Sequence, residues 1–178
     1  MVGIVMDKLN TIWTIGHSTR SADEFLNLLK INKIALLADI RSLPGSRKFP
    51  HFDKEVLEKS LPEAGIEYIH LRNLGGRRKV NRDSKNTAWR VPAFRGYADY
   101  MESEDFETAA KELEHLAHER RVVIMCSEAV WWRCHRGLVA DWLKLRGWKV
   151  MHILTLKKSE EHPYTSVARI VNGKLCYS

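Results

Sequence analysis

The feature that most constrains the fold of this chain is the alternation of short apolar runs with longer amphipathic segments. The apolar runs cover residues 11–15, 34–40, 66–71, 122–125 and 150–154, and each has the length of a buried strand. The segments between them have apolar residues spaced three or four apart, as in helices that cover a sheet. Parallel strands need such crossover connections. The pattern therefore predicts an α/β domain with a mainly parallel sheet flanked by helices in three layers, as in Rossmann-like folds.

Local signals predict where several of the helices begin and end. Ser21 and Glu24 form a capping box, which begins the first helix. Asp53 is expected to cap the second helix and Gly65 to end it. The inward side of this second helix is expected to carry Val56, Leu57 and Leu61. Further helices are expected over residues 96–101, 106–118 and 134–145.

The whole chain, residues 1–178, is expected to form a single domain. Its 178 residues, of which 44% are apolar, suffice for one hydrophobic core. Residues 1–10 are expected to be an N-terminal extension, and Asn172-Gly173 predicts a C-terminal β-hairpin. No apolar run approaches the ~18 residues of a membrane span, and the N-terminus lacks the features of a secretion signal. We therefore expect a cytoplasmic protein without a membrane partner.

The net charge limits the classes of binding partner that we expect, and the cysteine content limits the roles of the thiols. A net charge of +7 favours an anionic partner, such as a nucleic acid, a nucleotide or a phosphorylated metabolite. Three cysteines do not make a disulfide framework, and thiols in a reducing compartment are structural, metal-binding or catalytic. Cys176 is remote in sequence from other reactive groups and is expected to be inert.

Polar residues follow nearly every predicted strand. They occupy residues 17–18, 41–49, 73–78, 126–136 and 155–165. The carboxyl ends of parallel strands meet at one edge of the sheet, which is where ligands of such folds bind. We therefore expect these residues to line one pocket.

The densest set of reactive groups lies between the strand at 122–125 and the helix after it. The strand ends at Cys126, and the following loop brings Cys134, His135 and Arg136 to the start of that helix. Thiol, imidazole and guanidinium groups therefore meet near one strand-to-helix turn, where we expect the chemistry.

A set of short motifs runs through the chain in a fixed order. They are Gly16-His17-Ser18, Asp39-Ile40-Arg41, Pro44, Ser46-Arg47, Leu74-Gly75-Gly76, residues 95–101 and residues 126–136. Over residues 11–178 this pattern resembles the family called domain of unknown function 488. The resemblance implies an α/β domain whose motif positions here are His17, Arg41, Arg95, Cys126, Glu128, Cys134, His135 and Arg136. Ser127 departs mildly from the family pattern, which has a small residue such as Ala after the first cysteine.

Cys134 is the first candidate for a catalytic residue. The helix dipole and the neighbouring arginines favour its thiolate form, so it is expected to be a nucleophile or a redox thiol. His135 or His17 would then move protons. The alternative is a structural cysteine buried beneath two tryptophans.

Cys126 has two further interpretations. The loops of cysteine phosphatases and rhodaneses place five residues between Cys and Arg, whereas six separate Cys126 from Arg133, so that chemistry is disfavoured. Cys126, Cys134 and His135, with His17, are candidate ligands for zinc or iron, although no short Cys-x-x-Cys spacing supports a metal. A reversible disulfide between the two cysteines requires their Cα atoms to lie within ~7 Å.

The remaining candidate residues carry charge or bind anions. Glu128 is expected either to transfer protons or to hold Arg133 or Arg136 in place. Arginines along the predicted edge present planar forks that bind phosphate or carboxylate, and the alternative for them is a solvated basic surface. The full set of expected binding residues is Ser18, Arg41, Ser46, Arg47, Gly75, Gly76, Arg95, Tyr97 and Arg136.

These observations favour an enzyme, a thiol-dependent hydrolase or transferase, acting on an anionic substrate related to nucleotides, nucleobases or nucleic acids. No cofactor is required by the sequence, with zinc or iron as the alternative. Two other functions stay open: a binding module for nucleotides or nucleic acid in which the cysteines only pack, and a Cys/His metal-binding protein.

Overall fold

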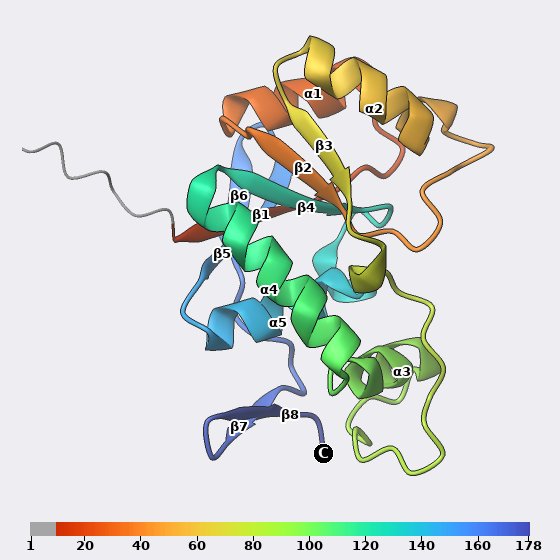
Figure 1. Cartoon of the computed structure of the whole chain (residues 1–178), viewed down its shortest axis with the longest axis vertical. Coiled ribbons are helices and arrows are strands. Elements are labelled where there is room, and N and C mark those ends of the chain that lie inside the picture. Colours follow the sequence, from red (N-terminus) through yellow and green to blue (C-terminus); the bar gives the residue numbers. More distant parts are fainter. Residues whose placement is uncertain (1–9) are drawn as a thin grey trace, which may run out of the picture.

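A computed structural model describes residues 10–178, which form a six-stranded sheet in the order β3-β2-β4-β1-β5-β6, covered by helices (Figure 1). The first five strands in this order run parallel, and β6 is antiparallel to β5. The strands of the sheet are β1 (Thr11–Gly16), β2 (Leu36–Asp39), β3 (Glu67–His70), β4 (Val122–Cys126), β5 (Lys149–Thr155) and β6 (Lys158–Glu161). The predicted α/β class with a mainly parallel sheet is confirmed.

The helices and the terminal hairpin complete the described part of the chain. The α-helices are α1 (Ala22–Ile31), α2 (Lys54–Glu63), α3 (Pro92–Tyr100), α4 (Glu104–Glu119) and α5 (Arg136–Leu145). Three short 3-10 helices are η1 (Pro50–Phe52), η2 (Arg72–Leu74) and η3 (Trp131–Arg133). The predicted C-terminal hairpin is confirmed as β7 (Arg169–Val171) and β8 (Lys174–Cys176). It turns at Asn172-Gly173, where both residues have positive φ.

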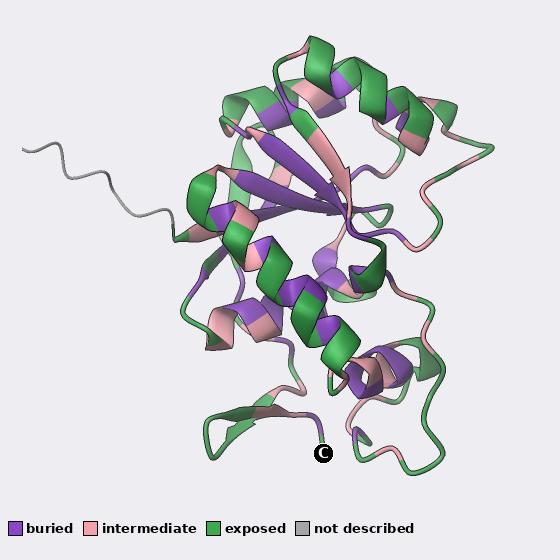
Figure 2. Ribbon diagram, viewed as in Figure 1, coloured by how far each residue is buried: buried purple, intermediate pink, exposed green. Residues whose placement is uncertain are grey.

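The two faces of the sheet have separate hydrophobic cores. Along β1, Trp13 and Ile15 pack with α1 and α2, whereas Ile12 packs with the cluster under α3, α4 and α5. Adjacent strand residues point to opposite faces, so both faces of the central strands are apolar and buried (Figure 2). The sheet is therefore the middle of three layers.

The predicted helix ends need two corrections in α2. Ser21 caps α1 as expected, because its hydroxyl accepts a hydrogen bond from the Glu24 N–H at 3.1 Å. Asp53 occupies the N-cap position of α2, but its carboxylate binds the Ser46 N–H at 2.7 Å and does not cap the helix. Val56 was expected to point inward and is 41% exposed, while the other two expected core positions of this helix are buried.

Three further boundaries differ from the sequence prediction. Helix α5 begins at Arg136, two residues later than expected, because residues 131–133 form η3 and leave Cys134 extended. Helix α3 begins at Pro92, where proline is compatible with a first turn. Strand β6 was not predicted, because its polar sequence Lys-Ser-Glu-Glu lacks an apolar side. Residues 1–9 of the expected N-terminal extension lie outside the described residues.

Asp99 anchors the long polar connection between β3 and α3. The Asp99 carboxylate accepts hydrogen bonds from the Asn81 N–H, the Ser84 hydroxyl and the Asn86 side-chain amide at 2.6–2.8 Å. These bonds hold the pKa of Asp99 below its ordinary value, although burial acts in the opposite direction. Gly96 lets the loop approach the helix, since a Cβ there would lie 2.1 Å from the Arg78 carbonyl oxygen.

Among residues 10–178, none of the helices has both the length and the apolar character of a bilayer-spanning segment.

Candidate active site

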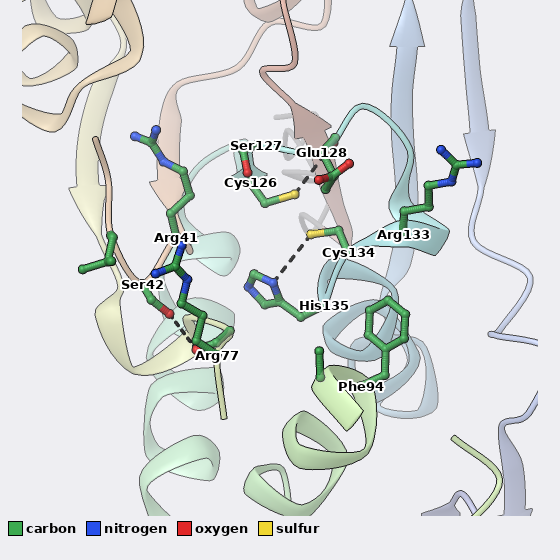
Figure 3. A pocket seen from close by; sticks show the side chains of 13 residues that line it. Arg41, Ser42, Arg77, Phe94, Cys126, Ser127, Glu128, Arg133, Cys134 and His135 are labelled. Carbon is green, nitrogen blue, oxygen red and sulfur yellow. Dashed lines mark hydrogen bonds between the residues drawn. The ribbon is translucent and has the colours of Figure 1, made fainter. Parts of the chain in front are cut away.

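A pocket lies at the carboxyl edge of the sheet beside β4, where successive connections leave for opposite faces. The chain leaves β1 and β2 for the face with α1 and α2, and it leaves β4 for the opposite face with α5. Such a point of divergence opens a crevice in parallel sheets. The cavity has a volume of about 240 Å³ (Figure 3). It is lined by Arg41, Ser42, Leu43, Gly76, Arg77, Ala93, Phe94, Cys126, Ser127, Glu128, Arg133, Cys134 and His135.

The loop that carries the reactive residues is anchored on the end of β1. The N–H groups of His17 and Ser18 donate to the carbonyl oxygens of Cys126 and Ser127 at 2.9 and 3.0 Å. The Glu128 backbone crosses directly over Gly16, where an added Cβ would lie 1.6 Å from the Glu128 carbonyl oxygen. The motif Gly16-His17-Ser18 therefore supports the loop through its backbone.

Cys134 and His135 form a thiol–imidazole pair that faces the pocket. The Cys134 Sγ lies 3.6 Å from His135 Nδ1, and His135 Nε2 lies 3.0 Å from the Ile40 carbonyl oxygen. A carbonyl oxygen only accepts hydrogen bonds, so Nε2 carries the proton and Nδ1 presents a lone pair to the thiol. Burial lowers the pKa of His135, which keeps the ring neutral. A Cβ at Gly76 would lie 3.1 Å from Nδ1, so this glycine leaves room for the imidazole.

Arg136 lies beneath Cys134 and is 1% exposed. Its backbone N–H is 3.4 Å from the Cys134 Sγ, and its guanidinium donates to the Glu128 carbonyl oxygen at 2.8 Å and to Thr14 Oγ1 at 3.2 Å. Its Nε has no partner, and none of its partners among the described residues is a carboxylate. A buried cation without an anion is costly, so an anion at Cys134 or in the pocket would be stabilised here.

The two pocket thiols have opposite tendencies to ionise. Burial raises the pKa of Cys126, and its contact with Cys134 raises it further. Burial also opposes ionisation of Cys134, but the hydrogen bond with Cys126 and the charge of Arg136 outweigh it and lower the pKa of Cys134. The Cys126 thiol donates to the Glu128 carbonyl oxygen at 3.8 Å. Cys134 is therefore the sulfur that ionises more readily.

Arg41 is held rigidly at the opposite wall. Its guanidinium forms a bidentate ion pair with the buried Asp39, at 2.9 and 2.7 Å, and donates to the Phe52 carbonyl oxygen at 2.8 Å. Its Nη1 is 3.4 Å from His17 Nε2. The His17 ring stacks on Phe52 with centroids 4.4 Å apart, and burial lowers its pKa. Nη1 is thus the nitrogen of the Arg41 guanidinium without an oxygen acceptor among these contacts.

The structure brings only some of the predicted residues to the pocket. Those that line it are Arg41, Gly76, Cys126, Glu128, Cys134 and His135. The expected pairing of the Glu128 carboxylate with an arginine is not observed among the described residues, because Arg136 binds the Glu128 carbonyl oxygen and the Glu128 side chain is exposed.

The other predicted binding residues do not line the pocket. Arg95 donates to the carbonyl oxygens of Trp89 and Thr87, and the Tyr97 hydroxyl donates to that of Leu74. Both residues therefore hold the long loop in place. Residues without pocket contact are Ser18, Ser46, Arg47, Gly75, Arg95, Tyr97 and the buried Arg136 and His17.

Sequence reasoning missed several residues of this site. Ala93 and Phe94 line the pocket, and nothing in their local sequence distinguishes them from surface residues. Thr14 contacts Arg136 from the middle of β1, where a β-branched residue fits any strand. The position of Thr14 on the same strand as the Gly16-His17-Ser18 motif was the one available signal.

The three candidate metal ligands do not form a metal-binding group. In the part of the chain that the structure describes, no set of three or more His, Cys, Asp or Glu side chains is arranged to hold a metal ion. His135 directs Nε2 at a carbonyl oxygen, which leaves only Nδ1 on the side of Cys134.

The fold and the pocket define an α/β domain with a thiol, an imidazole and arginines at the carboxyl edge of its sheet. The model of the family described as Domain of unknown function DUF488 matches residues 21–143, and the chain belongs to this family. The match confirms the resemblance drawn from the motifs. Neither the curated proteins nor the solved structures contain a match to the chain.

Proposed function

We propose that this protein is a thiol-dependent hydrolase or transferase that acts on an anionic substrate, with Cys134 as the nucleophile. The observation that carries the proposal is the buried Arg136 guanidinium, which has no carboxylate partner among the described residues and whose charge favours the ionised form of Cys134. A thiolate at Cys134 supplies the missing negative charge. His135 Nδ1 faces the same sulfur and is free to accept its proton.

The reaction proceeds in two steps that balance in atoms and charge. The thiol proton moves to His135 Nδ1, and the Cys134 sulfur attacks an electrophilic carbon or phosphorus of the substrate. The bond to the leaving group breaks, and the leaving group takes the bonding pair and the proton. Water, or an acceptor hydroxyl or amine in a transferase, then displaces the sulfur and returns a proton to Cys134. No cofactor takes part in these two steps.

The pocket favours a substrate with a negatively charged group. Arg41, Arg77 and Arg133 line it, and Glu128 is its one acidic lining residue. A cavity of about 240 Å³ is below the roughly 300–1,000 Å³ typical of sites for drug-sized ligands. It therefore fits an anionic group of the substrate and not a whole nucleotide.

A neighbouring groove gives room for the rest of a longer substrate. This groove has a volume of about 460 Å³ and shares Ser42, Leu43, Gly76 and Arg77 with the pocket. Its other lining residues are Arg72, Asn73 and Arg78. A groove with three arginines and no acidic residue supports a substrate that continues into further phosphate groups, as nucleotides and nucleic acids do.

A burst assay tests the proposal. The purified protein is mixed with chromogenic aryl phosphates and with aryl esters that bear a carboxylate, and the aryl product and the protein mass are followed. We expect a burst of about one product per protein molecule and a covalent adduct on Cys134. Cys134→Ser should lose both, whereas the matched control Cys176→Ser should keep both, since Cys176 lies outside the pocket.

A non-catalytic binding module is the second candidate, and the burial of both cysteines favours it. Cys126 and Cys134 are only 2% and 6% exposed, as structural cysteines are. In this case Cys134→Ala would bind pyrophosphate with unchanged affinity in calorimetry. No probe would then give a burst with the unmodified protein.

A further inference from the structure

Buried polar side chains form a hydrogen-bond chain that runs from Arg136 to Asp141. Thr14 Oγ1 lies 2.6 Å from His152 Nδ1, His152 Nε2 lies 2.9 Å from His162 Nδ1, and His162 Nε2 lies 2.7 Å from an Asp141 oxygen. At its other end, Thr14 Oγ1 accepts from the Arg136 guanidinium at 3.2 Å. The pocket does not include any member of this chain.

The donors and acceptors in this chain have one consistent direction. Thr14 Oγ1 accepts from Arg136, so its own proton goes to His152 Nδ1. His152 is then protonated on Nε2 and donates to His162 Nδ1, and His162 donates from Nε2 to the Asp141 carboxylate. Every ring nitrogen has a partner with the correct role. Burial, and then the neighbouring His162 and Arg136, lower the pKa of His152 to about 2, so the ring is neutral as this direction requires.

The anionic end of the chain is fixed from several sides. The Asp141 oxygens also accept from the Thr165 N–H and hydroxyl and from the Tyr177 hydroxyl at 2.5–2.8 Å. Asp141, His152 and His162 are each at most 1% exposed. Stability alone does not explain such a set, because an apolar core of the same volume avoids the cost of burying it.

We propose that Thr14, His152, His162 and Asp141 are positioning residues that hold the Arg136 guanidinium beneath the Cys134 sulfur. This inference rests on the proposed function, because its purpose is to stabilise the Cys134 thiolate. Thr14 holds Nη1 of Arg136, whereas Nη2 is held by the Glu128 carbonyl oxygen and Nε has no partner. The charge of the distant Asp141 reaches the guanidinium only through the aligned dipoles of the chain.

Other ionisable groups also face Cys134 and stay unchanged in the test. Cys126 lies across from it on β4, His135 follows it, and the Tyr97 ring packs 5.0 Å from the His135 ring. The charged residues of the same pocket are Arg41, Arg77, Glu128 and Arg133. A change confined to Thr14 therefore isolates the contribution of the chain.

The experiment is a pH titration of the Cys134 thiolate in three variants of the full-length protein. The ultraviolet absorbance of the thiolate is recorded, and the same titration with Cys134→Ser added is subtracted. Thr14→Val removes the hydroxyl at nearly constant volume, and Thr14→Ser restores it. Ile12→Val, in the same strand and core but outside the chain, controls for loosened packing.

We expect Thr14→Val to raise the midpoint by about one pH unit, a roughly tenfold loss of thiolate below the midpoint. Thr14→Ser and Ile12→Val should titrate like the unmodified protein. An unchanged midpoint in folded Thr14→Val overturns the inference, and so does an equal shift in Ile12→Val or the absence of a Cys134 titration. A normal titration without any burst in the aryl assay contradicts the proposed function alone.

Discussion

Replacing Arg136 by methionine distinguishes the effect of its buried charge on the pKa of Cys134 from its effect on folding stability. The substitution removes the guanidinium whose charge lowers the pKa of Cys134, and it keeps the backbone N–H that lies 3.4 Å from the sulfur. An opposite charge within ~4–6 Å shifts a pKa by roughly 1–3 units, so we expect the pKa of Cys134 to rise by about that amount. Alkylation of Cys134 at neutral pH should then slow at least tenfold.

The net effect on folding stability should be modest, because two contributions oppose each other. Arg136→Met leaves the Glu128 carbonyl and Thr14 Oγ1 without their donor, which costs roughly 1–3 kcal/mol for each group that stays unsatisfied. It also removes the cost of burying a guanidinium that has no anion beside it, and this gain offsets part of the loss. We therefore expect a net destabilisation of about 1–2 kcal/mol in urea unfolding.

The assay is iodoacetamide alkylation across a pH series, with each cysteine read separately by peptide mass spectrometry. Arg133→Met is the matched control, because Arg133 lines the same pocket but is exposed to solvent, which screens its charge. Its midpoint should move by a few tenths of a unit at most. Equal shifts in both variants, or none in Arg136→Met, would refute the electrostatic reasoning.

Three further predictions follow from the fold and the site. Gly16→Ala should lower the free energy of unfolding in urea by about 1–3 kcal/mol, because its Cβ would overlap the Glu128 carbonyl, whereas Gly45→Ala, with no neighbour nearer than 3.8 Å, should change it little. Burial lowers the pKa of His152 to about 2 from the 6.5 of a free imidazole, so its unfolded form alone binds a proton between these values. The contribution of His152 to stability is thus complete above pH 6.5 and declines as the pH falls towards 2; urea unfolding at several pH values should show this decline, and His152→Gln should reduce it. Arg77→Ala should weaken pyrophosphate binding in calorimetry severalfold, with a smaller dependence on salt, and should leave the Cys134 titration unchanged.

The sequence predicts most of this fold because buried strands are visible in it as apolar runs. The strands β1, β2 and β4 are largely apolar and buried, since both of their faces are covered by helices. Strand β6 has no apolar run, because it lies at the edge of the sheet and its pairing with β5 depends on backbone hydrogen bonds. Val56 shows the opposite error, since an apolar residue in a helix does not by itself indicate which side is buried.

The sequence also predicts that Cys126, Cys134 and His135 share a pocket, because all three follow one strand. It does not predict which partner an arginine finds. Arg41 and Arg95 look equivalent in the sequence, yet Arg41 lines the pocket and Arg95 binds loop carbonyls. The partner of each arginine depends on which carbonyl oxygens the tertiary fold brings close to it. No local sequence pattern predicts this.

The position of β1 between β4 and β5 has a consequence for how the chain matures during synthesis. The first strand leaves the ribosome early, but its two neighbours begin at Val122 and Lys149. Contacts between such distant segments form late in folding. The Arg136 contact to Thr14 therefore assembles only after Arg136 has been made, and the loop crosses Gly16 only after Glu128 has been made. The surroundings of Cys134 are thus completed by segments that lie far apart in the sequence.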